Sequence, residues 1–150
     1  MADIRCVWWN TKNLFPYVAA NAGKGSWPRS PDEYLAKLEA VAAALRSNGE
    51  VPDLVLLCEV ANKDVAGGGC DVGADLAYAL GAEMDAWTGG RAFADSRGIG
   101  FAALWRRSAV TMLDEPTAHA AENPLLGAGP GLSLIHIRRR RRPPPFRSRW

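Results

Sequence analysis

An unbroken apolar run, Leu54 to Cys58, ends directly at a carboxylate, Glu59, and this arrangement limits the folds open to the chain. Five apolar residues preceded by Pro52 and Asp53 are typical of a short strand buried on both faces. A carboxylate at the end of such a strand is costly to hold near a core unless it faces solvent, pairs with a cation or binds a metal. The run therefore predicts a core strand with a charged group fixed at its end.

The residues before this run predict a strand followed by a helix. Ile4 to Trp9 is apolar and rich in β-formers, and the polar residues 10–13 that follow are turn formers. A helix is expected from Pro31, because Ser30 can cap it and Glu33 completes a capping box. Apolar residues then recur at helical spacing up to the stop at residues 48–49, namely Leu35, Leu38, Val41, Ala42 and Leu45.

After Glu59 the pattern continues with a second helix and further strands. Asp71 to Leu80 has helical spacing, and Gly81 lies just past its end. Phe101 to Trp105 predicts a third strand, and Val110 to Leu113 a fourth. Residues 114–131 are rich in Ala, Gly and Pro and are expected to be loop, with His119 a solvated loop residue.

Composition sets limits on the class of protein. A chain of 150 residues, 48% hydrophobic and 23% charged, is long enough for one domain with a core. No apolar run approaches the roughly 20 residues of a membrane helix, and residues 1–10 lack the pattern of a secretory signal. Three scattered cysteines do not make a disulfide framework or a zinc motif. We therefore expect a cytoplasmic protein with no membrane segment.

The basic residues are concentrated in residues 132–150, which hold seven of the 18 lysines and arginines and no acid. Residues 1–131 therefore carry 11 basic and 16 acidic groups, a net charge of −5. Residues 132–137 read Leu-Ser-Leu-Ile-His-Ile. One reading frame of a transposase end sequence that is used to prepare DNA sequencing libraries encodes the same six residues in the same order. We expect residues 132–150 to be a non-native basic tail. The alternative is a nucleic-acid-binding arm centred on Arg138 to Arg142.

Two polar residues stand at predicted strand ends, Asn10 and Glu59, where α/β folds commonly gather ligand groups. Each also has an ordinary structural interpretation, because Asn is a common turn residue and a strand-end Glu can simply face water. Their functional interpretation depends on the segments around them.

Three ordered segments together resemble the endonuclease/exonuclease/phosphatase superfamily. The segments are residues 4–15 around Asn10, the run Pro-Asp-Leu-Val-Leu-Leu-Cys-Glu-Val of residues 52–60, and Arg-Gly-Ile-Gly-Phe-Ala-Ala-Leu-Trp-Arg of residues 97–106. They are similar to the opening strand of that family, to its metal strand Pro-Asp-Ile-Ile-x-Leu-Gln-Glu-Val, and to the Arg-Gly-Ile-Asp-Val-Ala-Leu-Leu-Tyr strand of its bacterial members. The resemblance covers about residues 4–110, and three motifs in order are more specific than one.

The resemblance implies a metal-dependent phosphodiesterase, nuclease or phosphatase. Glu59 is expected to bind Mg²⁺ or Mn²⁺ directly, a hard cation suited to carboxylate oxygens. Asn10 is expected to order the metal site and to share in holding the metal, so both are candidate catalytic residues. Arg97 is expected to neutralise a phosphate of the phosphoester substrate, which includes nucleic acid as a candidate. No protein partner is implied.

The chain also departs from the family pattern. Gly100 stands where the related strand often has Asp, and Ile99 where nuclease members carry a phosphate-contacting Tyr. No Asp-x-Asn and no Ser-Asp-His, which carry the water-activating groups of the family, occurs after residue 114. We therefore expect residues 1–131 to be the N-terminal part of an α/β sandwich domain of roughly 250 residues. The sheet of residues 1–131 is expected to be mixed and mainly antiparallel, with helices on one face and an exposed apolar face. The chain is expected to have no catalytic activity of its own.

Overall fold

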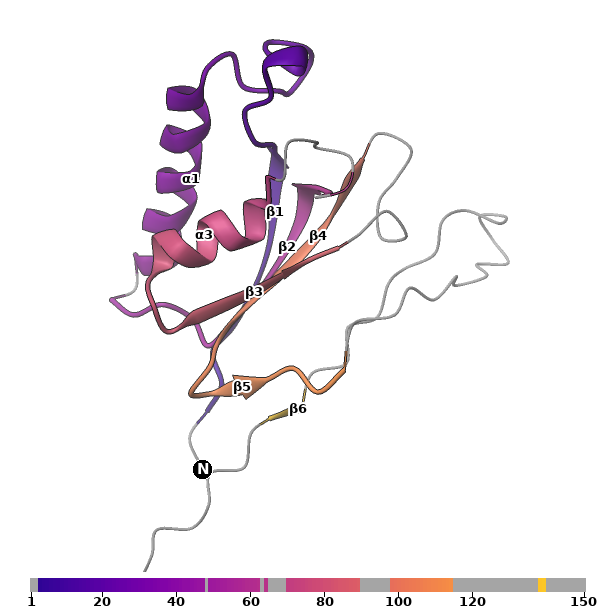
Figure 1. The fold of residues 1–150 in the computed structure, drawn as a ribbon. Helices are drawn as coiled ribbons and strands as arrows, with labels where there is room; N and C mark the ends of the chain where they lie inside the picture. The colour runs from indigo at the N-terminus through magenta and orange to yellow at the C-terminus, as the bar shows by residue number, and fades with distance from the viewer. Residues whose placement is uncertain are drawn as a thin grey trace, which may run out of the picture.

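The computed structural model describes residues 3–47, 49–62, 64, 70–89 and 98–114, and the backbone of residues 138 and 139. Figure 1 shows the arrangement of the helices and strands. In chain order the elements are β1 (Cys6–Leu14), a short 3-10 turn (Ala19–Asn21), α1 (Pro31–Arg46), β2 (Leu54–Ala61), α3 (Val72–Leu80), β3 (Met84–Thr88), β4 (Ile99–Arg106), β5 (Val110–Thr111) and β6 (Arg138–Arg139).

The main sheet has four strands in the order β1-β2-β4-β3. β1 and β2 are parallel, whereas β2–β4 and β3–β4 are antiparallel. Both α1 and α3 lie on the same side of this sheet (Figure 1), and residues of both helices enter one core. The predicted class, an α/β domain with a mixed, mainly antiparallel sheet, is confirmed. β5 and β6 form a separate antiparallel pair.

The start of α1 follows from its capping residues. The Ser30 side chain accepts a hydrogen bond from the Glu33 backbone N–H at 3.2 Å, as predicted. The Glu33 carboxylate accepts from the backbone N–H of Arg29 at 2.7 Å, one residue earlier than in a standard capping box. Leu35, one of the apolar residues at helical spacing, is exposed, whereas the buried stripe begins at Tyr34 and continues with Leu38, Val41, Ala42 and Leu45.

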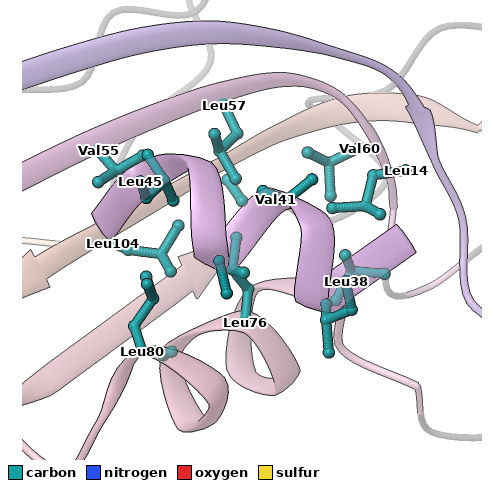
Figure 2. Close-up of a cluster of buried hydrophobic side chains, with 14 of the residues drawn as sticks. Leu14, Leu38, Val41, Leu45, Val55, Leu57, Val60, Leu76, Leu80 and Leu104 are labelled. Atoms are coloured by element: carbon teal, nitrogen blue, oxygen red, sulfur yellow. The ribbon is translucent and has the colours of Figure 1, made fainter. Parts of the chain in front are cut away.

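The core lies between the helices and one face of the sheet (Figure 2). Leucine and valine side chains from both helices meet Val55 and Leu57 of β2 and Leu104 of β4, and all of them are buried. Burying such a side chain contributes about 1.5–3 kcal/mol, so this layer is the main source of stability. It also fixes the ends of β1 and β2 relative to α1.

The second face of the sheet is more open. Leu54, Leu56 and Cys58 are only half-buried, so burial of this strand on both faces was wrong. Trp8 on β1 is 74% exposed, which agrees with the expected exposed apolar face at this position. The chain thus presents a sheet with one covered and one partly uncovered face.

Three strands differ from the sequence prediction. β2 does not end at Glu59 but continues to Ala61, because the chain bulges at Glu59 and then pairs again with β4. β1 does not end at Trp9 but continues to Leu14, through residues predicted to form a turn. β3 was not predicted, because Met84–Thr88 is short and includes the polar Asp85. It pairs along β4 from Met84–Arg106 to Thr88–Ala102 and forms an edge of the sheet.

The Asp53 carboxylate connects the starts of β1 and β2 to the end of β4. It accepts a hydrogen bond from the Arg5 backbone N–H at 3.1 Å and lies 3.3 Å from Arg106 Nε. Asp53 is therefore a structural residue at the sheet end remote from Glu59. No helix within the described ranges is long and apolar enough to cross a membrane.

Candidate active site at the ends of β1 and β2

Asn10 and Glu59, predicted from separate strands, are in direct contact. The Asn10 side-chain Nδ2 donates a hydrogen bond to Glu59 Oε1 at 2.7 Å. Their meeting follows from the parallel pairing of β1 and β2, in which Asn10 lies beside Cys58. The carboxyl ends of parallel neighbours meet at one edge of a sheet, where ligand groups commonly gather.

Glu59 occupies a bulge in β2. Its φ is 59°, in the left-handed region, and the pairing with β4 shifts between Cys58 and Val60. Val55 and Leu57 face the core, so strict alternation would place residue 59 there as well. Instead the extra residue lets Val60 enter the core at 0% exposure, while the Glu59 carboxylate stays half-buried beside Asn10. The bulge thus keeps a charge out of the core.

β1 contains a matching irregularity opposite this bulge. Lys12 and Asn13 have φ values of 52° and 62°, and the pairing with β2 shifts between Asn10 and Leu14. Leu14 then pairs with Val60, and both are fully buried. Asparagine adopts the left-handed conformation readily, but for lysine it costs roughly 1–2 kcal/mol, and such strain is concentrated at functional sites.

Two side chains hold these irregular segments in place. The Thr11 hydroxyl lies 3.0 Å from both the Cys58 and the Glu59 carbonyl oxygens and can donate to either. Lys37 Nζ on α1 donates to the carbonyl oxygens of Lys12 at 3.0 Å and Asn13 at 2.7 Å. Sequence reasoning assigned no role to Thr11 or Lys37, because both act through backbone carbonyl groups that no residue pattern reveals.

The electrostatics of the site involve Lys37, Cys58 and Glu59. Burial lowers the pKa of Lys37, while the negative charges of Glu33 and Glu59 oppose that shift. Burial, and then the Glu59 charge, raises the pKa of the Cys58 thiol. The charge of Glu59 therefore acts on both the Lys37 ammonium group and the Cys58 thiol.

The metal-binding capacity of the described residues is limited. They contain no group of three or more His, Cys, Asp or Glu side chains that could hold a metal ion. Mg²⁺ is commonly held by only one or two carboxylates and keeps several water ligands. A single half-buried carboxylate on a fixed bulge fits that manner of binding. The Asn10 amide donates to Glu59, and its oxygen accepts from the Lys12 backbone N–H at 2.8 Å, so Asn10 orients the carboxylate.

Asn62, which sequence reasoning missed, joins three segments at this end of the sheet. Its side chain is 1% exposed and donates from Nδ2 to the Gly89 carbonyl oxygen at 2.6 Å. Its backbone N–H donates to the Gly98 carbonyl oxygen at 2.9 Å. From sequence alone, an Asn just after a strand cannot be told from an ordinary turn Asn.

Several predicted residues lie outside the described part of the chain. These are Arg97, His119 and the tail at 132–150, of which only the backbone of residues 138 and 139 is described. Gly98, the described residue that follows Arg97 in the sequence, accepts a hydrogen bond from the Asn62 backbone N–H just after the end of β2.

Comparison of the chain with protein-family models, curated proteins and solved structures finds no match. The resemblance to the endonuclease/exonuclease/phosphatase superfamily therefore rests on the three segments themselves.

Proposed function

We propose that this chain is the N-terminal part of a divalent-metal-dependent phosphoesterase of the endonuclease/exonuclease/phosphatase type, with Glu59 as its metal carboxylate. The observation that carries the proposal is the bulge at Glu59. The left-handed conformation of Glu59 turns its carboxylate away from the core and brings it into contact with Asn10. Such a strained conformation is costly for a side chain that only faces solvent.

The described residues would each contribute a definite part. Glu59 would hold Mg²⁺ or Mn²⁺ through a carboxylate oxygen, and Asn10 would fix the rotamer of that carboxylate. When bound, the ion would polarise a phosphoryl oxygen and stabilise the leaving oxygen. Arg97, which precedes Gly98 in the sequence, would neutralise a further phosphate charge.

We propose further that residues 1–150 do not themselves turn over substrate. The described residues include no histidine, and the sequence after residue 114 lacks the Asp-x-Asn and Asp-His signatures of the family. A phosphodiester assay with Mg²⁺ tests this directly. Turnover that Glu59→Gln abolishes would overturn the inactivity and support the site.

The genomic sequence downstream of codon 131 tests the family assignment. The proposal expects an open frame that continues into a strand with Asp-x-Asn and ends with an Asp-His pair. A natural stop codon soon after codon 131, or a long frame without these groups, would contradict it.

A second function, nucleic-acid binding by an arginine-rich arm, is favoured by the run Arg138 to Arg142 alone. It predicts that a chain carrying Glu59→Gln binds DNA like the wild type, and that deletion of residues 132–150 abolishes binding. The phosphoesterase proposal requires neither result.

A further inference from the structure

Lys37 projects from α1 to the end of β1. It lies between Tyr34 and Val41 on the inward stripe of the helix, and its half-buried ammonium group reaches two consecutive carbonyl oxygens. These belong to Lys12 and Asn13, the two left-handed residues of β1. An ammonium group has three donors and no acceptor, so it is well suited to satisfying carbonyl groups in an irregular segment.

The same segment determines where Asn10 lies. The Asn10 oxygen accepts from the Lys12 N–H, and the Asn10 nitrogen donates to Glu59. A continuous series of contacts thus runs from α1 through the bulge of β1 to the candidate metal carboxylate. We propose that Lys37 is a positioning residue, which holds the end of β1 so that Asn10 presents Glu59 to the metal. This inference rests on the proposed function.

The positive charge of Lys37 and its positioning role have opposite effects on metal binding. Whether removal of Lys37 strengthens or weakens metal binding therefore tests the proposal. A cation near Glu59 repels a divalent ion, so removal of its charge alone would tighten metal binding. If Lys37 instead holds the carboxylate in place, its removal weakens binding. Partners that orient metal ligands typically contribute 10–100-fold in affinity.

The experiment is a titration of the full 150-residue chain with Mn²⁺, with free Mn²⁺ measured by electron paramagnetic resonance. Lys37→Met, which retains a good helix former, is expected to bind about tenfold more weakly than wild type. Lys37→Arg keeps donors and charge and is expected to recover part of that loss. Lys12→Met is the matched control, because it removes an exposed charge at the same strand end and leaves the backbone carbonyl group in place.

The outcomes separate this proposal from the proposed function. Wild-type or tighter Mn²⁺ binding by Lys37→Met, together with loss of binding in Glu59→Gln, overturns the role of Lys37 and leaves the metal site standing. Absence of Mn²⁺ binding by the wild-type chain, or unchanged binding in Glu59→Gln, contradicts the metal site instead.

A measurement without metal still tests whether Lys37 determines the position of the Asn10 side chain. The Asn10 side-chain amide signal in ¹H–¹⁵N spectra is expected to move in Lys37→Met and to stay in place in Lys12→Met. An unmoved signal in Lys37→Met overturns the positioning role whatever the metal data show.

Discussion

Replacement of Glu59 by glycine separates a residue kept for stability from one kept for function. At φ 59° the glutamate is in a conformation that glycine adopts freely. Glu59→Ala keeps the backbone strain and loses the hydrogen bond to Asn10, whereas Glu59→Gly loses the bond and relieves the strain. The two variants therefore differ mainly in the strain of the left-handed backbone at residue 59.

The magnitude follows from the conformation and the exposure of the contact. Left-handed backbone costs a residue other than glycine roughly 1–2 kcal/mol, and glycine loses about 0.5–1 kcal/mol through its more flexible unfolded chain. We therefore expect Glu59→Gly to be more stable than Glu59→Ala by about 1 kcal/mol. The exposed hydrogen bond to Asn10 contributes about 0.5–1.5 kcal/mol, which the relieved strain largely offsets, so Glu59→Gly should lie within about 1 kcal/mol of wild type.

Urea unfolding followed by tryptophan fluorescence measures these free energies, and 1 kcal/mol corresponds to a midpoint shift of about 0.5 M. Glu39, an exposed residue of α1, is the control. In a helix the alanine variant should have a free energy of unfolding about 1 kcal/mol higher than the glycine variant. An alanine variant at residue 59 as stable as the glycine variant, or a loss of several kcal/mol in both, would refute the account. Glu59 would then be a structural residue in relaxed backbone.

Three further changes test the packing around the site. Gly73→Ala should destabilise the fold by about 1–3 kcal/mol in thermal unfolding, because the new Cβ would lie 2.3 Å from Thr88 Oγ1. Adding Thr88→Ala to this variant should restore part of the lost stability. Strictly additive losses from the two substitutions would contradict this clash. Burial, and then the hydrogen bond to Asp75, raises the pKa of Tyr34. The stability this gives is therefore present below about pH 10, where free tyrosine ionises, and is lost as the pH rises further. Tyr34→Phe should flatten that decline in urea midpoints, and an unchanged slope would refute it. Trp8→Thr, at an exposed position, should reduce light scattering at high concentration and change the unfolding free energy by less than about 0.5 kcal/mol; undiminished scattering would show that aggregation starts elsewhere.

Local signals in the sequence predicted much of the fold. The start of α1 could be placed because Ser30 and Pro31 mark it within a few residues, and Gly81 marks the end of α3 in the same way. β3 was missed because an edge strand with Asp85 exposed has neither a continuous apolar run nor clear alternation. Its stability comes from pairing with β4, a partner that its own sequence does not reveal.

The candidate site was predicted in part. Predicted strand ends and motif order brought Asn10 and Glu59 to attention, and the structure places them in contact. Both residues lie inside their strands, so their predicted position at strand ends was wrong. The left-handed conformations of Lys12 and Glu59 could not be predicted, because neither residue type favours φ above zero. Lys37 was counted only as part of a helix, since its contacts with distant backbone carbonyl groups depend on how α1 packs on the sheet.

Magnesium-dependent hydrolysis of a phosphodiester tests the central claim most directly, measured on the longer protein that we propose the genomic frame beyond codon 131 encodes. The account predicts activity that falls by about 10²-fold or more in Glu59→Gln and persists in Glu39→Gln, a matched change at an exposed helical glutamate. Hydrolysis at the wild-type rate by the Glu59→Gln protein would contradict it.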